Sequence, residues 1–396
     1  MSNNLKQPII IDLGSSEIKA GLFSNSSPSI RLNNIIGESL PIKNSSSLNK
    51  DHYISSECDQ YYNDLLIRYP IQRGVFVNDE DIQLIFEYIL TQIGLNPEQM
   101  KEHPLLISEP INNKLSNSEK ISEILFEKMN IPALIFAKQP LLSLISTGYS
   151  TGVVLESGSD ITQSCVSCEG YLIKNSFFRC DYGGKDVTNV LKILLKQNNI
   201  DIRNNSLDDT KILNEIKEKQ CYIKTLKDEN DDFVSLLSEY ILPDGNRLKL
   251  NDEKILAPEI LFNNKLIFAE DLTFHEMVIS SIDKVDINIK DKLYKTIILS
   301  GGNTKFKGIE EKMIVNLSYL IPRGVDIKIK TQINPELNCW NGGKVIASLN
   351  IFNKMLVDKK EWEECGKNII QVRYLRYPDP GLCSGENFPE SELGSG

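Results

Sequence analysis

The sequence has few histidines and few cysteines: its 396 residues include three histidines and eight cysteines. His52, His103 and His275 lie far apart, and none has a second histidine at a metal-binding spacing. Eight cysteines over this length do not resemble a disulfide framework, so we expect a reducing compartment. Cys165 and Cys168 form a C-x-x-C pair, but i and i+3 point to opposite faces of a strand, which argues against a zinc site.

Long apolar runs and surplus positive charge are also absent. No stretch of about 18 apolar residues occurs, so no membrane span is predicted. The first eight residues, MSNNLKQP, lack the apolar core of a secretory signal, and we expect none. The net charge of -10 argues against a surface that binds nucleic acid directly. The length predicts two or more domains of an intracellular protein.

Short apolar segments alternate with amphipathic ones along the chain. Segments 78–94 and 118–130 carry apolar residues at i, i+3 and i+4 behind polar starts, which predicts helices. Five other segments are short, apolar and rich in β-branched residues, and they stop at Gly, Pro or an acid, as strands covered on both faces do. These five segments are 7–14, 103–110, 132–140, 151–158 and 295–302. The alternation predicts an α/β architecture.

Two of these strands end in the same pattern, acid-x-Gly-Ser. It occurs as DLGS from Asp12 and as ESGS from Glu156. Glycine allows a tight turn whose backbone N–H groups approach an anion, and serine adds donors. The acids would repel phosphate unless a hydrated magnesium ion lay between them. Two facing turns would therefore clamp a nucleoside triphosphate, whereas the alternative is two unrelated strand-to-turn junctions.

Nine segments extend along the chain in an order that is typical of one family. They are YPIQRGVFVNDEDIQLIF, EHPLLISEPINNK, LLSLISTG, EGYLIKNSFFRCDYGGKDVT, EIKEKQCYI, YILPDG, APEILF, ILSGGNTKFKGIEEKM and WNGGKVIASLNIF. With these segments the chain resembles actin and the actin-related proteins from about residue 8 to residue 370. Within the family, the blocks APEILF, FKGIEEKM and KKEWEECG resemble the centractin branch, the filament-forming subunit of dynactin.

The resemblance implies two duplicated actin-like (ribonuclease H-like) domains around a nucleotide cleft, each with a smaller subdomain. The polar segment 38–51 is expected to be an exposed loop of the first small subdomain. The implied boundaries are 1–33, 71–145 and 338–375 for subdomain 1, 34–70 for subdomain 2, 146–183 and 271–337 for subdomain 3, 184–270 for subdomain 4, and 376–396 for a disordered tail.

The resemblance also implies ATP or ADP with magnesium or calcium in the cleft. Asp12 and Glu156 would hold the cation through water. The first phosphate loop would comprise Asp12, Gly14, Ser15, Ser16 and Lys19, and the second Glu156, Gly158, Ser159 and Asp160. The nucleoside would be surrounded by Gly184, Lys185, Lys217, Glu218, Gly301, Gly302 and Phe306.

Several of these positions depart from the family pattern. Ser16 stands where the family has glycine and would crowd the phosphates. Glu156 and Ser159 each replace an aspartate, which would shift a water-mediated cation. Glu336 replaces a lysine over the adenine and reverses the local charge, and Phe306 replaces a tyrosine.

Hydrolysis in this family depends on positioning an attacking water. Gln139 matches the glutamine that orients this water, and Gln163 stands in place of a histidine. A glutamine cannot take a proton near neutral pH. We therefore expect nucleotide binding with slow or absent hydrolysis, at most a slow ATPase, and an empty cleft is the alternative.

Loop 38–51 matches a segment that inserts into the neighbouring subunit in filament-forming relatives. It is polar here, which reduces apolar burial at such a contact. We expect a structural subunit of a filament or dynactin-like complex, assembled with other actin-like subunits or a multi-protein cytoskeletal complex in the cytoplasm. The alternatives are a motile, polymerising actin-like ATPase and an actin-related subunit of a nuclear chromatin-remodelling complex.

Overall fold

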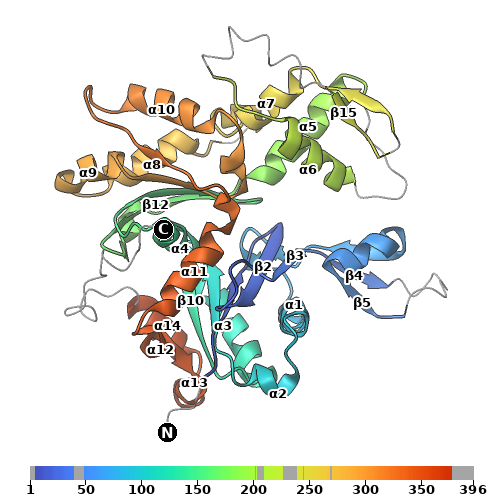
Figure 1. The fold of residues 1–396 in the computed structure, drawn as a ribbon, viewed down its shortest axis with the longest axis vertical. Coiled ribbons are helices and arrows are strands. Elements are labelled where there is room, and N and C mark those ends of the chain that lie inside the picture. Colours follow the sequence, from blue (N-terminus) through green and yellow to red (C-terminus); the bar gives the residue numbers. More distant parts are fainter. Residues whose placement is uncertain are drawn as a thin grey trace.

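The computed structural model describes residues 5–39, 49–200, 202, 209–225, 239–243, 245–267 and 270–376. Two lobes, each built on a six-stranded sheet, lie one above the other in Figure 1. We call the lobe that contains Asp12 the first lobe and the lobe that contains Glu156 the second lobe. The expected α/β fold with two similar halves is confirmed.

The first lobe has a mixed sheet whose central strands are parallel. Residues 9–11 are almost completely buried because helices cover both faces of the sheet, which explains the continuous apolar run. The strands run in the order β19 (Val357–Asp358), β10 (Ala133–Lys138), β9 (Leu105–Glu109), β1 (Ile9–Asp12), β2 (Glu17–Leu22) and β3 (Ile30–Asn33).

The second lobe repeats the central part of this topology. In each sheet an antiparallel hairpin lies beside a parallel strand, with β1–β2 next to β9 and β11–β12 next to β17. Its strands run in the order β13 (Tyr171–Leu172), β12 (Thr162–Cys168), β11 (Gly152–Ser157), β17 (Ile297–Ser300) and β18 (Ile329–Lys330), and β14 (Phe178–Cys180) also pairs with β12.

Two helices join the lobes: α4 (Gln139–Ser146) and α11 (Asn338–Ser348) pack against each other at the junction (Figure 1). A Cβ atom on Gly342 would lie 1.9 Å from the carbonyl oxygen of Leu142, so only glycine permits this approach. Trp340 is completely buried, and its indole N–H donates to the Ile10 carbonyl at 3.2 Å. α11 is thereby fixed both to β1 of the first lobe and to α4.

Smaller sheets and helices surround this frame. A three-stranded sheet combines β5 (His52–Ile54), β4 (Ile36–Ser39) and β6 (Leu65–Arg68), and the two-stranded sheets are β7 (Ile71–Gln72) with β8 (Val75–Phe76) and β15 (Glu239–Ile241) with β16 (Arg247–Lys249). The remaining α-helices are α1 (Asp79–Gln92), α2 (Pro97–Met100), α3 (Leu115–Glu123), α5 (Gly184–Gln197), α6 (Asp209–Gln220), α7 (Glu253–Glu259), α8 (Phe274–Asp283), α9 (Ile287–Tyr294), α10 (Ile309–Leu320), α12 (Phe352–Met355), α13 (Lys359–Cys365) and α14 (Asn368–Arg376).

The five predicted strands are present as β1, β9, β10, β11 and β17, and the helix predicted over 78–94 is α1. Asn78 caps α1 by accepting the Glu80 N–H at 3.1 Å. The second predicted helix differs in its last part, because α3 continues as a π-helical turn over Ile124–Lys128. In the described part of the chain no helix is long and apolar enough to cross a bilayer. Most of loop 38–51 and nearly all of tail 376–396 lie outside the described residues.

Candidate functional site

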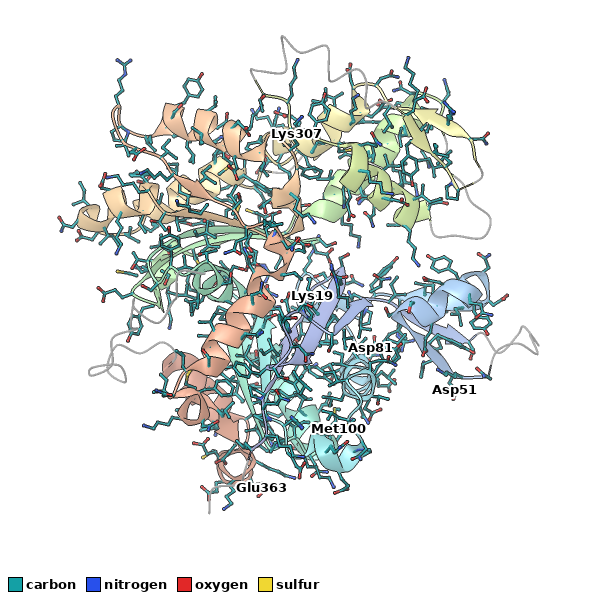
Figure 2. The ribbon with its side chains drawn as sticks, in the orientation of Figure 1. Lys19, Asp51, Asp81, Met100, Lys307 and Glu363 are labelled. Carbon is teal, nitrogen blue, oxygen red and sulfur yellow. The ribbon has the colours of Figure 1, made fainter. Side chains whose placement is uncertain are left out.

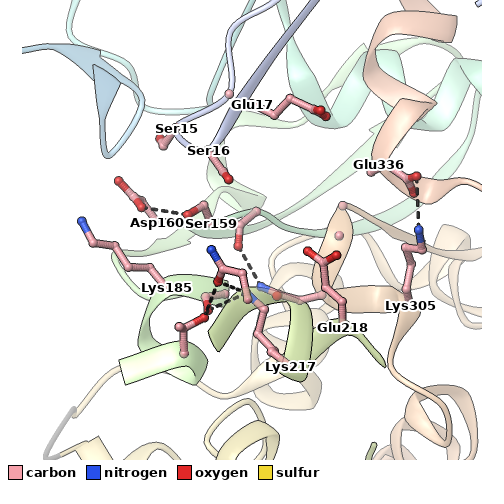
Figure 3. A pocket seen from close by; sticks show the side chains of 18 of the residues that line it. Ser15, Ser16, Glu17, Ser159, Asp160, Lys185, Lys217, Glu218, Lys305 and Glu336 are labelled. Atoms are coloured by element: carbon pink, nitrogen blue, oxygen red, sulfur yellow. Dashed lines mark hydrogen bonds and ion pairs between the residues drawn. The ribbon is translucent and has the colours of Figure 1, made fainter. Parts of the chain in front are cut away.

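A cleft with a volume of about 1450 Å³ opens between the two lobes. Figure 3 shows Ser15 and Ser16 of the first lobe opposite Ser159 and Asp160 of the second. The structure brings every site residue predicted from the sequence to this cleft. These residues are Asp12, Gly14, Ser15, Ser16, Lys19, Gln139, Glu156, Gly158, Ser159, Asp160, Gln163, Gly184, Lys185, Lys217, Glu218, Gly301, Gly302 and Phe306.

The two acid-x-Gly-Ser turns are the bends of two β-hairpins that follow the same plan. Asp12 pairs across its hairpin with Lys19, and Glu156 pairs across its hairpin with Gln163. Both partners are seven residues after the acid. Each carboxylate therefore has one fixed cross-strand neighbour, a cation in the first hairpin and an amide in the second.

Asp12 is buried at the end of β1, beside a cation and a hydroxyl. The Ser108 hydroxyl donates to Asp12 Oδ1 at 2.7 Å, and Lys19 Nζ lies 3.5 Å from Oδ2. Lys19 lies where the two lobes meet (Figure 2). The Asp12 carboxylate is therefore held between a hydroxyl donor and a lysine.

Glu156 lies near the end of β11, and both of its side-chain hydrogen-bond partners, Gln163 and Ser143, are neutral. Gln163 donates to its Oε2 at 3.1 Å, and the Ser143 hydroxyl lies 3.4 Å from its Oε1. Burial, followed by the negative charge of Asp12, raises the pKa of Glu156 to about 8. Asp12 and Glu156 both line the cleft, near enough for the charge of Asp12 to raise the pKa of Glu156.

Gln139 and Gln163 link the two hairpins. Gln163 Nε2 donates to Gln139 Oε1 at 3.1 Å, and Gln163 Oε1 accepts the Ile111 N–H at 2.9 Å. Gln139 Nε2 lies 3.3 Å from both Leu13 O and Ser108 Oγ. These contacts orient both amides, so Gln139 presents an acceptor rather than a donor to a molecule in the cleft.

The first turn has room for an anion at its backbone. Among the described residues, the N–H groups of Gly14, Ser15 and Ser16 have no hydrogen-bond acceptor. In the second turn, the Gly158 N–H donates to Ile161 O at 2.9 Å, and the Ser159 hydroxyl donates to Asp160 at 3.1 Å. Successive free N–H groups beside Lys19 suit a phosphate group.

A contact across the cleft connects the two turns through Arg73. The Arg73 N–H donates to Asp160 Oδ2 at 3.1 Å, and its guanidinium lies 3.4 Å from Asp181. The guanidinium of Arg179 donates to the Arg73 carbonyl at 2.7 Å. The next N–H along the chain, of Gly74, donates to Ser15 Oγ at 3.3 Å. One segment of the first lobe thus touches both turns.

The far end of the cleft is lined by Phe306 and by charged side chains. Lys217 Nζ donates to Gly184 O at 3.1 Å, and burial lowers the pKa of this lysine. Figure 3 shows Glu218 and Glu336 near this end. Glu336 forms an ion pair with Lys305 at 3.2 Å. The expected reversal of charge at Glu336 is therefore offset locally by a lysine that the sequence had not pointed to.

Ser108, Ser143 and Arg73 bond to predicted site residues but were not themselves predicted from the sequence. A signal existed for Ser108, because it ends a strand expected to be parallel to β1, and the carboxyl ends of parallel strands meet at one edge. Ser143 lies inside an apolar helix and Arg73 in a turn, and neither carries a local signal.

The residues present fit a nucleotide with a divalent cation. Two carboxylates line the same cleft, and a cation between them would relieve their repulsion. Across the described ranges no three His, Cys, Asp or Glu side chains gather as direct metal ligands. The pair would therefore hold a hydrated ion through one or two carboxylates, as magnesium prefers. Lys19 and the open N–H groups of the first turn supply donors for a polyphosphate.

Comparison with known proteins agrees with this geometry. The family model described as Actin matches residues 4–375. The chain belongs to the actin family. Centractin of Schizosaccharomyces pombe is 34% identical over 378 residues, which cover 93% of this chain and 98% of centractin. The chain is thus an actin-related protein similar to centractin over almost its full length.

Proposed function

We propose that this actin-related protein binds ATP or ADP together with magnesium or calcium in the cleft between its lobes. The observation that carries the proposal is the pair of matched hairpins, whose residues Asp12, Lys19 and Glu156 all line one cleft. Proteins of the actin family bind a nucleotide with a divalent cation. A bound cation would neutralise phosphate charge and relieve the repulsion between the two carboxylates.

Each part of the cleft has a role in this proposal. Lys19 and the N–H groups of the first turn bind the phosphates. Asp12 and Glu156 accept hydrogen bonds from the water shell of the cation. Residues at the far end surround the nucleoside, and these are Gly184, Lys185, Lys217, Glu218, Gly301, Gly302 and Phe306.

Hydrolysis is slow or absent in this proposal. Gln139 Oε1 can accept a hydrogen bond from a water molecule, since its own NH₂ group is turned toward Leu13 O and Ser108. Gln163 touches the same amide but offers no group that takes a proton near neutral pH. The cleft therefore orients a water molecule without providing a base at this position.

The protein then serves as a structural subunit of a cytoskeletal filament or of a dynactin-like complex in the cytoplasm. Support comes from the similarity to centractin over 98% of that protein. The polar composition of segment 38–51 favours assembly with other actin-like subunits over growth of a filament from this chain alone.

Equilibrium dialysis with radiolabelled ATP, with and without magnesium, tests the binding. We expect retention at micromolar nucleotide and stronger retention with magnesium. No retention in either condition would remove the proposal. Phosphate release and sedimentation, measured on the same sample, test the role: a structural subunit releases little phosphate, whereas a cycling motile ATPase sediments and releases phosphate together.

A further inference from the structure

Ser108, at the end of β9, is buried between the first turn and the glutamine pair. It is 1% exposed, and its hydroxyl has three nitrogen or oxygen partners and lies beside the Cys339 thiol. The hydroxyl donates to Asp12 Oδ1 at 2.7 Å, accepts the Leu13 N–H at 3.0 Å and lies 3.3 Å from Gln139 Nε2. No other side chain in the described part of the chain touches both Asp12 and Gln139 in this way.

The direction of each of these bonds is determined by the chemistry of the groups. A serine hydroxyl has one hydrogen and two lone pairs. The Leu13 N–H and the Gln139 NH₂ group can only donate, so they occupy the two lone pairs. The hydroxyl hydrogen is left for Asp12, which as a carboxylate only accepts. Ser108 is therefore fully satisfied in a single orientation.

This orientation decides which oxygen of Asp12 is free. Oδ1 accepts the short bond from Ser108, whereas Lys19 makes the longer contact of 3.5 Å to Oδ2, and the Cys339 thiol is a further neighbour of both Asp12 and Ser108. A bond of 2.7 Å to a charged acceptor is strong, and a contact of 3.5 Å is weak. Ser108 thus sets the rotation of the carboxylate and leaves Oδ2 for the water shell of a cation.

The same hydroxyl helps to orient Gln139. Its lone pair and the Leu13 carbonyl both attract the NH₂ group of Gln139, which turns Oε1 toward Gln163 and the cleft. Replacing the hydroxyl by a methyl group would leave Asp12 Oδ1 and the Leu13 N–H without these partners. Both the cation-facing oxygen and the amide of Gln139 would then lose one of their restraints.

We propose that Ser108 is a positioning residue that aims Asp12 Oδ2 at the hydrated cation and holds the Gln139 amide in its acceptor orientation. This inference rests on the proposed function, since it names a residue that acts on the same site. Partners that orient groups around a metal typically change its affinity by about tenfold to a hundredfold when they are removed.

The test compares Ser108→Ala with the full-length protein by isothermal titration of ATP, in excess magnesium and in excess EDTA. We expect ATP affinity in magnesium to fall about tenfold, with a change of less than about twofold in EDTA. Ser108→Thr retains the hydroxyl and borders a small void of about 10 Å³, so it should recover most of the affinity. The matched control is Ser122→Ala, which removes another buried hydroxyl from the first lobe, bonded to Ser118 O at 2.8 Å.

The comparison of Ser108→Thr with Ser108→Val repeats the test if the alanine variant does not fold, because these two side chains differ only in a hydroxyl and a methyl group. Equal losses of affinity in magnesium and in EDTA, or no loss in either, would overturn the inference while leaving nucleotide binding intact. Absence of ATP binding by the parent protein would instead overturn the proposed function.

Discussion

The two hairpins at the cleft share their pattern and their spacing but differ in the partner of the acid. Asp12 lies opposite Lys19, and Glu156 lies opposite Gln163, each seven residues further along the chain. Asp12 has a cation as its cross-strand partner, whereas Glu156 has an amide. Burial and the negative charge of Asp12 raise the pKa of Glu156 to about 8. The two acids therefore occupy equivalent places in their hairpins but have different electrostatic surroundings.

The two turns also differ in whether their backbone N–H groups are already hydrogen-bonded. The first turn leaves the N–H groups of Gly14 to Ser16 open to the cleft in the described structure. The second turn bonds the Gly158 N–H internally, and Asp160 is held by the Arg73 N–H. In the proposed site the two hairpins therefore have different roles. The first hairpin offers N–H donors to an anion, and the second holds a carboxyl whose pKa is raised to about 8.

The largest effect is expected from Asp12→Asn. Because an asparagine amide carries no negative charge to attract the cation, this change should weaken ATP binding in magnesium about a hundredfold, or about 2.7 kcal/mol. Glu156→Gln should weaken ATP binding in magnesium by only about tenfold. The loss is smaller because the Glu156 carboxyl is largely protonated at pH 7 without a cation, so less negative charge is removed. Isothermal titration measures both, with the exposed Glu98→Gln as a control. Equal losses of ATP affinity in Asp12→Asn and Glu156→Gln would contradict different roles for the two acids.

A second test makes the same substitution in both turns. A Cβ atom on Gly14 would lie 2.4 Å from Glu17 O, whereas on Gly158 the nearest atom, Ile161 O, is 3.7 Å away. Gly14→Ala should destabilise the protein by about 2 kcal/mol, and Gly158→Ala by less than about 0.5 kcal/mol. Thermal unfolding of the ligand-free variants measures the difference. A larger loss of stability for Gly158→Ala than for Gly14→Ala would contradict this prediction.

The dependence of stability on pH should arise from the second hairpin. The folded pKa of Glu156, about 8, lies above its ordinary value of 4.5. Between these values the folded protein retains a proton that the unfolded chain has lost, so stability is full below pH 4.5 and is lost as the pH rises through 8. The slope is at most about 1.4 kcal/mol per pH unit.

Thermal unfolding of the ligand-free protein from pH 5 to pH 8, compared with Glu156→Gln, isolates this slope. The variant should show a flatter profile, because its side chain does not titrate. Magnesium with ATP should also flatten the parent profile, since a cation favours the ionised carboxyl. Parallel profiles for parent and variant would show that Glu156 does not titrate in this range.

The smallest effect is expected from changing Gln163, the cross-strand partner of Glu156, and it concerns the rate of phosphate release. Gln163→His places a proton acceptor beside Glu156 and Gln139 and should raise the rate of phosphate release about tenfold. Gln163→Asn is the control, since it keeps an amide and adds no base. A single-turnover assay with bound ATP measures both rates. Equal rates in the two variants would remove proton transfer from the explanation of slow hydrolysis.

Much of this molecule could be predicted because the signals were local. Continuous apolar runs such as Ile9–Asp12 indicated buried parallel strands, and the repeated acid-x-Gly-Ser pattern located both turns. The π-helical turn at Ile124–Lys128 interrupts a regular apolar pattern and was not predicted. Lys305, which pairs with Glu336 from 31 residues away, carries no sequence signal for that contact.

The sequence by itself determined which residues end the strands, and therefore which chemical groups are available: two acids, a lysine, two glutamines and the glycines of the turns. Only the tertiary structure decided how these groups influence one another. The pKa of Glu156 depends on burial and on Asp12, 144 positions away, and the orientation of Gln139 depends on Ser108 from a neighbouring strand. Strand ends follow from local patterns, whereas electrostatic and hydrogen-bond coupling depends on distances that arise when the lobes pack together.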